Sequence, residues 1–373
     1  MFPDGFELPD GFTDTVDWTP LCDLAIALRR RGHEVVMVTL NPSVTNDVRL
    51  YHEGLDVVIG PMRPRARQRM LDLNSGEVKV ISRLLSQLSF DVVHAHWTYE
   101  YAIAAAATRK PSAVTAHDCP PIIFLHQRNL YRLLRMIVGI KGMRASHVLS
   151  TVSPYMASCV GKLSGVEPLI IPNMIDERSI DVRPYSLRPK TLRILAVSNG
   201  FHGRKNGPVL LKAFASVHQA MPDSVLVLLG SDMESGGVAS TWALKHGLEE
   251  GVAFIGRQSR SKTMEHMKES TLLVHVSLEE SFGMVAIEAM ASGLPVIAGD
   301  NAGALPWVIA DAGVLTDVTS PQEVAQCILD LCSDDDRYGR LVAGGEQNVR
   351  RRFTYDRVVS QYEELYVRAI GFK

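Results

Sequence analysis

The stretch Ser277–Asp300, which reads SLEESFGMVAIEAMASGLPVIAGD, carries the strongest signal of fold in the chain. The preceding run Thr271–Val276 is continuously apolar, which is typical of a buried parallel strand. A sharp turn, a helix beginning near Phe282-Gly283, a break at Gly293 and a second apolar run follow. This order predicts a strand–turn–helix–strand unit of a parallel α/β sheet. The acidic turn then lies at the carboxyl edge of the strands, where such sheets bind ligands.

Two carboxylates, Glu280 and Glu288, stand eight positions apart around this turn. The helix beginning after Phe282 would direct free N–H groups and a positive dipole end at the same edge, which suits a phosphate. Two glutamates alone are more often ordinary surface residues. Beside an anion-binding helix end, however, they indicate a sugar or a pair of ribose hydroxyls next to a phosphate.

Length and composition indicate a globular protein of about two domains. The 373 residues are 46% hydrophobic and 21% charged, and the net charge of -2 gives no general attraction to nucleic acid. The five cysteines show no metal-ligand spacing, and we interpret Cys327 and Cys332 as core residues of a protein in a reducing compartment. No apolar run reaches the roughly 18 residues of a membrane span, and the amino terminus has no basic start or apolar core typical of a secretory signal. These features predict a cytoplasmic location.

Alternating helix and strand patterns divide the chain into two α/β halves with a ligand-sized cleft expected between them. The predicted domains are residues 1–172 and 191–352. A proline-rich charged linker, 173–190, joins them, and an amphipathic helix, 353–373, ends the chain. Only Met1-Phe2 precedes the first Pro-Asp-Gly turn, so the first strand is expected to be missing or truncated.

A second candidate site is the loop Ser198–Gly207, SNGFHGRKNG, which lies between a predicted strand and a helix with Pro208 in its first turn. Its glycines allow close backbone approach, and Lys205 supplies a point charge for a phosphate. It is not a Walker loop, and an ordinary strand-to-helix turn explains the pattern equally well. His117, and with less weight His96, follow predicted strands at the carboxyl edge of the first sheet.

Two arginine-rich stretches stand out in the first half. The segment 61–70 carries four arginines in seven positions, and the predicted helix 126–144 places Arg128, Arg132 and Arg135 on one face. A solvated surface is the favoured interpretation of both. The alternative is a basic rim for an anionic acceptor, or a helix lying in a membrane interface.

Taken together, ESFGMVAIE, AMASGLPVIA, DVVHAH, VTAHD, KNGPVLLKAF and FTYDRVVSQYEELY resemble the retaining, GT-B-fold glycosyltransferases of family 4. The resemblance runs along nearly the whole chain in the family's order. It implies two Rossmann-like parallel-sheet domains facing across a cleft, with the nucleotide-sugar donor held mainly by the second. It also implies that the final helix crosses back to the first domain.

The resemblance also implies roles for individual residues. Glu280 would lie near the donor sugar, Glu288 would accept hydrogen bonds from the ribose, and His117 would contact the transferred sugar. The diphosphate and base would be bound by a further set of residues, namely Lys205, Arg204, Asn199, the backbone of Ser281, Phe282 and Gly283, and Arg257. Several positions depart from the family pattern, among them Gly200, where the family has a phosphate-clamping arginine, and Trp307, where it has a sugar-contacting acid. Arg204 is the candidate to replace the missing arginine.

The implied activity is retaining transfer of a hexosyl group from a UDP- or GDP-sugar, without a cofactor or a metal. The acceptor would be a carbohydrate, a lipid-linked molecule or a small molecule, in polysaccharide, glycolipid or glycoside synthesis. Contact with the inner face of the membrane through the basic stretches stays open. The alternatives are a GT-B-fold sugar-nucleotide epimerase, a phosphorylase, or a catalytically degenerate binding protein. The missing arginine is the observation that favours the last of these.

Overall fold

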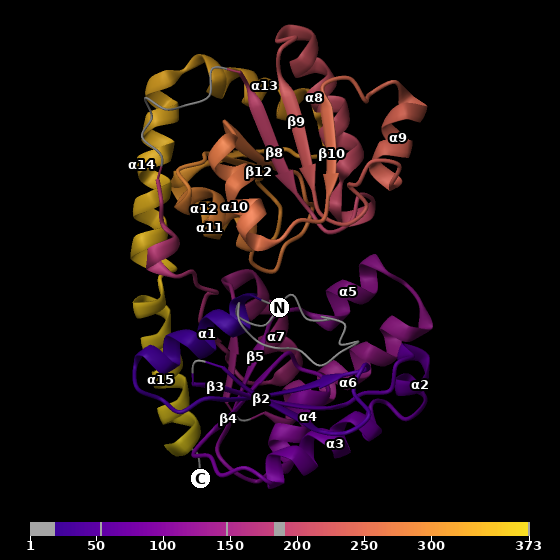
Figure 1. The fold of residues 1–373 in the computed structure, drawn as a ribbon, viewed down its shortest axis with the longest axis vertical. Coiled ribbons are helices and arrows are strands. Elements are labelled where there is room, and N and C mark those ends of the chain that lie inside the picture. Colours follow the sequence, from indigo (N-terminus) through magenta and orange to yellow (C-terminus); the bar gives the residue numbers. More distant parts are fainter. Residues whose placement is uncertain (1–18, 53, 147, 183–190, 372–373) are drawn as a thin grey trace. The chain divides into compact units, whose positions relative to one another are not determined.

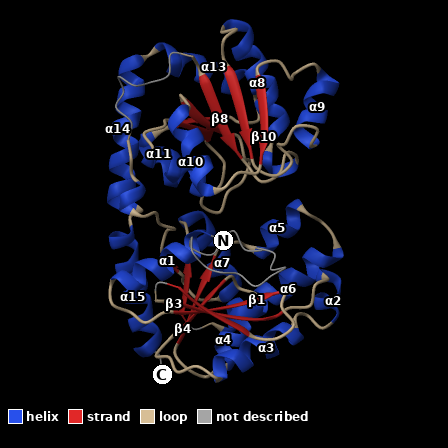
Figure 2. Cartoon of the chain, viewed as in Figure 1, coloured by secondary structure: helices blue, strands red, loops and turns tan. Residues whose placement is uncertain are grey.

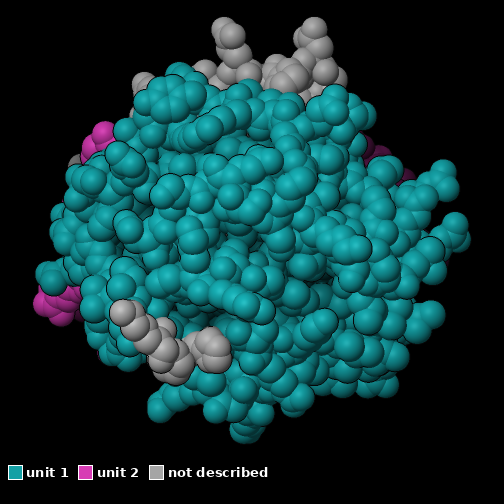
Figure 3. Space-filling model, turned by 90° about the horizontal axis from the view of Figure 1, so that it is seen from below, with its two compact units in different colours: residues 1–174, 355–373 teal, residues 175–354 magenta. Residues whose placement is uncertain are grey.

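The computed structural model describes residues 19–52, 54–146, 148–182 and 191–371, so the predicted truncation of the first strand lies outside the described residues. The chain forms two compact units. Unit 1 contains residues 1–174 and 355–373, and unit 2 contains residues 175–354. Figure 3 shows one face of unit 1, with both of its segments coloured teal.

Unit 1 holds two sheets covered by helices (Figures 1 and 2). The first has the strand order β1-β3-β2 and the second the order β4-β5-β6-β7. The strands are β1 (Val36–Asn41), β2 (Val48–His52), β3 (Leu55–Pro61), β4 (Val93–His96), β5 (Ser112–Ala116), β6 (Val148–Thr151) and β7 (Leu169–Ile170). The helices are α1 (Thr19–Arg30), α2 (Ala66–Leu71), α3 (Ser75–Ser86), α4 (Glu100–Ala107), α5 (Pro120–His126), α6 (Leu130–Ala145), α7 (Pro154–Ser164) and α15 (Tyr355–Gly371).

Helix α15, at the end of the chain, is part of the core of unit 1. Its apolar residues Val358, Tyr362 and Leu365 are buried against α1 and the second sheet. The Tyr355 hydroxyl donates a hydrogen bond of 2.6 Å to the buried carboxylate of Asp23 on α1. Burial of one face of this long helix explains why the sequence shows such a regular amphipathic pattern there.

Unit 2 is a six-stranded parallel sheet with the order β10-β9-β8-β11-β12-β13. Its strands are β8 (Arg193–Val197), β9 (Val225–Leu229), β10 (Val252–Gly256), β11 (Leu272–His275), β12 (Val296–Gly299) and β13 (Val314–Thr316). Its helices are α8 (Gly207–Ala220), α9 (Val238–His246), α10 (Arg260–Glu269), α11 (Met284–Ala291), α12 (Leu305–Ile309), α13 (Pro321–Ser333) and α14 (Asp335–Arg352), with 3-10 turns η1 (Glu177–Ser179), η3 (Gly203–Lys205) and η4 (Ala310–Ala312). Strands β11 and β12 are fully buried and β9 is buried except at Val225, which explains their continuous apolar sequence.

The predicted α/β fold with Rossmann-like parallel sheets is confirmed, with a local difference at β2, which pairs antiparallel to β3. The predicted helix 126–144 is wrong at its start, because α5 ends at His126 and Asn129 caps a new helix by accepting from the N–H of Arg132. The expected solvated arginine face holds for Arg128, which is exposed, but is wrong for Arg135. Arg135 turns inward to an ion pair with Glu100, and only 19% of its side chain is exposed.

Candidate functional site

The acidic turn follows β11 at the carboxyl edge of the unit 2 sheet. The backbone of Glu280 pairs with Gly303, and its carbonyl accepts from the N–H of Ala304 at 2.9 Å. Helix α11 begins at Met284 after Gly283, whose φ of 100° strongly favours glycine at this position. A Cβ at Gly283 would also clash with the side chain of Leu305. The turn is therefore held in one conformation by its neighbours.

The Glu280 carboxylate lies at the centre of a compact polar cluster. Lys205 Nζ lies 2.5 Å from Glu280 Oε1, and His275 Nε2 lies 3.2 Å from the same oxygen. The side chains of all three residues are at most 15% exposed. Lys205 and Glu280 are 75 positions apart, but β8 and β11 are neighbours in the sheet, so the loops that follow them meet at one edge.

The cluster holds Glu280 in its charged form. Burial raises the pKa of the carboxyl group, but the hydrogen bond from His275 and the charge of Lys205 outweigh this effect. The net result is a Glu280 pKa well below its usual range. An ionised carboxylate is therefore present beside Lys205 and the start of α11 at every physiological pH.

The Lys205 loop is fixed by its own contacts. Asn206 has a left-handed φ of 56°, and its side-chain amide donates to the carbonyl of Val318 at 2.7 Å. The Arg204 guanidinium donates to the carbonyl of Glu279 at 3.0 Å, and the Arg204 carbonyl accepts from the N–H of Leu278. Arg204 thus ties the lysine loop to the acidic turn, while Gly200 leaves space where the family pattern has an arginine.

The remaining predicted donor-binding residues lie on separate elements of unit 2. Glu288 is on α11, and Arg260 at the start of α10 lies 3.4 Å from its carboxylate. Arg257 follows β10 and its side chain is exposed. Asn199 Oδ1 accepts from the N–H of Ser231 at 3.3 Å, which joins the loops after β8 and β9.

Trp307, which replaces an acid of the family pattern, lies in an aromatic cluster of unit 2. Its ring is edge-on to Phe282 and to Phe353, at centroid distances of 6.4 and 6.1 Å. The Arg352 guanidinium lies 4.4 Å from the Trp307 ring centre and donates to the Trp307 carbonyl. This packing gives Trp307 a structural role in supporting the turn at Phe282.

In unit 1, His117 follows β5 and His96 ends β4, so neighbouring strands bring them together. Their facing nitrogens are 2.8 Å apart, and His117 is 9% exposed. Burial and the nearby His94 lower the pKa of His117 to about 3. Trp97 adopts a φ of 66°, a costly conformation for this residue, and its ring centre lies 5.6 Å from that of His117.

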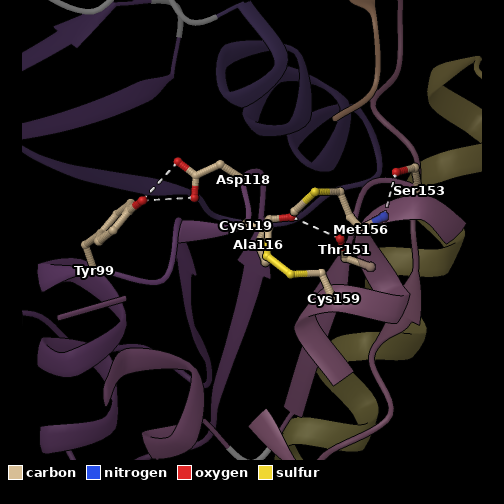
Figure 4. The surroundings of a disulfide bond; sticks show 8 residues. All are labelled: Tyr99, Ala116, Asp118, Cys119, Thr151, Ser153, Met156 and Cys159. Atoms are coloured by element: carbon tan, nitrogen blue, oxygen red, sulfur yellow. Dashed lines mark hydrogen bonds between the residues drawn. A yellow bond between two sulfur atoms is a disulfide. The ribbon is translucent and has the colours of Figure 1, made fainter. Parts of the chain in front are cut away.

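The cysteines depart from the interpretation of the sequence, because Cys119 and Cys159 form a disulfide. It joins the residue before α5 to α7, and Cys119 directly follows Asp118 in the chain (Figure 4). Asp118 accepts hydrogen bonds from the Tyr99 hydroxyl at 3.2 Å. Five scattered cysteines gave no sign of this pairing, since the two partners are 40 positions apart.

His275 was also missed in the sequence. It occupies the end of the apolar run TLLVHV, where a histidine is taken for one more buried strand residue. Its position five residues before Glu280 was the available signal, because a strand end and the following turn lie at the same edge. Within the described residues, no three His, Cys, Asp or Glu side chains are grouped as metal ligands, and no helix has the length and apolarity to cross a membrane.

Two family models match the chain in succession. The model for glycosyltransferase family 4 matches residues 21–179, and that for glycosyl transferases group 1 matches residues 180–348. The chain belongs to this family of glycosyltransferases, so it is a transferase of sugar groups. A relative, N-acetyl-alpha-D-glucosaminyl L-malate synthase of Bacillus anthracis, is 25% identical, with 92% of this chain and 91% of the relative covered.

Solved structures agree on the fold. Sucrose-phosphate synthase of Thermosynechococcus elongatus has a TM-score of 0.77 at 20% identity. The match covers 95% of this chain and 93% of the synthase chain. Anabaena HepE in complex with UDP-glucose has a TM-score of 0.68 at 19% identity. The match covers 89% of this chain and 99% of the HepE chain. These likenesses place the chain in the GT-B fold.

Proposed function

We propose that the protein transfers a hexosyl group from a nucleotide-diphosphate sugar to an acceptor hydroxyl with retention of the anomeric configuration. The observation that carries this proposal is the Lys205–Glu280–His275 cluster at the start of α11. It combines a cation for a diphosphate, a fixed carboxylate and helix N–H groups at one sheet edge. The solved relative that contains UDP-glucose supports a donor of this class, with UDP- or GDP-sugars as first candidates.

In this proposal the donor lies along the carboxyl edge of the unit 2 sheet. Lys205 and the N–H groups of Ser281, Phe282 and Gly283 bind the diphosphate, and Glu288 accepts hydrogen bonds from the ribose hydroxyls. Arg257 and Asn199 lie on loops that border the nucleotide. Arg204 ties the loop to Glu279 and also contributes positive charge. It thereby replaces the arginine that the family pattern has at the position of Gly200.

The chemistry that these groups support is cleavage of the bond between the sugar C1 and the phosphate oxygen. Negative charge develops on the leaving diphosphate, and Lys205 with the α11 amides stabilises it. The acceptor oxygen forms a bond to C1 on the face that the diphosphate leaves, and its proton passes to a phosphate oxygen. Glu280 in its ionised form and His117 in its neutral form serve as hydrogen-bonding groups for the sugar.

The acceptor in this proposal is a carbohydrate, a lipid-linked molecule or a small molecule with a free hydroxyl, bound by unit 1. Peripheral membrane contact through the basic stretches belongs to the same proposal. The absence of a metal requirement is a further part of it. Donor turnover that is unchanged by chelators supports this part, and activity restored only by a divalent cation contradicts it.

Calorimetric titration with UDP- and GDP-sugars tests the proposal. Lys205→Ala and Glu288→Ala each remove hydrogen bonds to a charged group, worth about 1.5–3 kcal/mol, so each is expected to weaken donor binding roughly 10- to 150-fold. Unchanged donor affinity in both variants contradicts the proposed site.

Matched controls come from exposed residues of the same unit. Lys212→Ala on α8 and Glu269→Ala on α10 remove the same charges from the surface and are expected to leave donor affinity unchanged. Incubation of the donor alone separates the main alternative, because an epimerase would convert the donor sugar without an acceptor. A transferase would instead hydrolyse the donor slowly.

A further inference from the structure

Helix α6 presents an apolar face to solvent. Leu130, Leu133 and Ile137 are 71%, 36% and 45% exposed. Spacings of three and four residues place them on one side of the helix, at roughly 3.6 residues per turn. The opposite side is buried through Val138, Gly142 and other residues. The exposure therefore belongs to the outer face of a well-packed helix.

Neighbouring segments extend this apolar surface. Helix α6 contacts both α2 and α5. Leu71 at the end of α2 is 85% exposed, Leu73 just after it is 42% exposed, and Leu125 on α5 is 60% exposed. Six of the twelve exposed large apolar side chains in the described part of unit 1 thus belong to these adjoining segments. Scattered exposed apolar residues need no explanation, but a group on contacting elements indicates a binding surface.

Apart from Asp72, which pairs with Arg63, the charge of this region complements an anionic partner. From Cys119 to Val166 the sequence contains six lysines and arginines and no aspartate or glutamate, although the whole chain has a net charge of -2. Lys141 and Arg144 are exposed and continue the same side of α6 beyond Ile137. Arg128 is exposed just before the helix.

Other arginines of the two basic stretches are used inside the fold. Arg135 pairs with Glu100 and stacks over Tyr99, and Arg63 pairs with the buried Glu77. Arg69 and Arg132 are only partly exposed, and they donate hydrogen bonds to the Arg63 carbonyl and the Gln127 side chain. The fully exposed cations of the two stretches are Arg65, Arg67, Arg128, Lys141 and Arg144. We call these five residues and the six exposed apolar ones the basic–apolar face.

We infer that the basic–apolar face docks unit 1 onto an anionic lipid bilayer, with α6 lying in the plane of the interface. Leucine and isoleucine side chains enter the acyl boundary, and the surrounding cations contact the anionic headgroups. An acidic protein would satisfy the cations but not a row of projecting leucines, so the combined chemistry favours the bilayer. This inference names the surface and the lipid class for the membrane contact of the proposed function, and it rests on that function for its purpose, which is to bring the transferase to a lipid-linked acceptor.

Co-sedimentation of the full chain with vesicles tests the inference. We expect binding to phosphatidylcholine vesicles that contain phosphatidylglycerol, little binding to pure phosphatidylcholine, and weaker binding as salt rises. The triple variant Leu130→Ser/Leu133→Ser/Ile137→Ser should lose at least about tenfold in partitioning. The variant Arg128→Glu/Lys141→Glu should lose most of the vesicle binding that is sensitive to salt.

Control variants change equally exposed residues elsewhere. Leu244→Ser on α9 and Val367→Ser on α15 each alter a side chain that is 69% exposed, and Lys79→Glu on α3 reverses an exposed charge. None should change vesicle binding. As a measurement that does not depend on loss of binding, Leu133→Trp should add a blue-shifted emission with anionic vesicles to that of the wild type, and brominated lipid acyl chains should quench it.

Several outcomes overturn the inference. These are vesicle binding that the triple variant and the charge variant leave unchanged, equal binding to neutral vesicles, or no quenching by brominated lipid of the tryptophan introduced by Leu133→Trp. Concentration-dependent self-association that the triple variant abolishes, without vesicle binding, would assign the face to a second copy instead. Donor titration of the same preparations separates the two proposals, since donor binding without vesicle binding overturns only the docking surface.

Discussion

Replacing Lys205 by methionine should destabilise unit 2 before any substrate is considered. The change leaves the Glu280 carboxylate, which is 15% exposed and lies 2.5 Å from the Lys205 nitrogen, without its cation. Breaking one partner of a buried ion pair costs about 3–5 kcal/mol. Glu280→Gln should cost less, about 1–2 kcal/mol, because the long Lys205 side chain can turn its amine toward water.

The double variant Lys205→Met/Glu280→Gln should recover most of that loss, since neither buried charge remains. The expected coupling between the two sites is about 2–3 kcal/mol. Native-state hydrogen exchange of peptides from β11 and α11 measures it in unit 2 alone, which avoids assuming that both units unfold together. Single-variant effects that simply add in the double variant, or a Lys205→Met cost below about 0.5 kcal/mol, would refute the reasoning.

Three further predictions concern other parts of the described structure. Burial lowers the pKa values of His94 and His117 to about 3, so the unfolded chain binds more protons than the folded one between about pH 6.5 and 3. Unit 1 should therefore lose up to about 3 kcal/mol of stability per pH unit on acidification below pH 6.5, which hydrogen exchange of β5 would report, and stability flat down to pH 4 would contradict it. Cys119→Ser/Cys159→Ser should lower the unfolding free energy of unit 1 by about 2–4 kcal/mol in oxidising buffer, from the 40-residue loop that the disulfide closes, and a reductant should lower the wild type to the same value. His275→Leu should remove a hydrogen bond to a charged group and cost about 1–3 kcal/mol in β11 exchange, with His275→Asn recovering part of the loss; equal exchange in all three proteins would show that the contact contributes nothing.

The site in unit 2 could be anticipated from sequence because it is built from chain order. A buried parallel strand followed by a polar turn delivers that turn to the carboxyl edge, so Lys205 and Glu280 were expected at one edge from the sequence. Their direct contact adds what the pattern could not give, since side-chain pairing depends on which strands are neighbours in the sheet.

The features that the sequence did not reveal depend on contacts between distant positions. The face of α6 was assigned wrongly because Asn129 starts a new helix there, and because the inward partner of Arg135, Glu100, lies 35 positions earlier. The partners in the disulfide, Cys119 and Cys159, are comparably far apart in the chain. Hydrophobic periodicity is a local property and contains no information on contacts between distant residues. It therefore predicted the helices and strands well, but it predicted poorly which charged side chains are buried.

Hydrogen exchange of the purified chain with and without a saturating UDP- or GDP-sugar tests the central claim most directly. Bound donor at 100 times its Kd stabilises the folded state by about 2.7 kcal/mol. The account predicts slowed exchange concentrated in the segments 198–207 and 277–288 of unit 2, with the Lys205→Ala protein showing less protection at the same donor concentration. Unchanged exchange in both segments with every donor, or protection confined to other parts of unit 2, would contradict the proposed donor site.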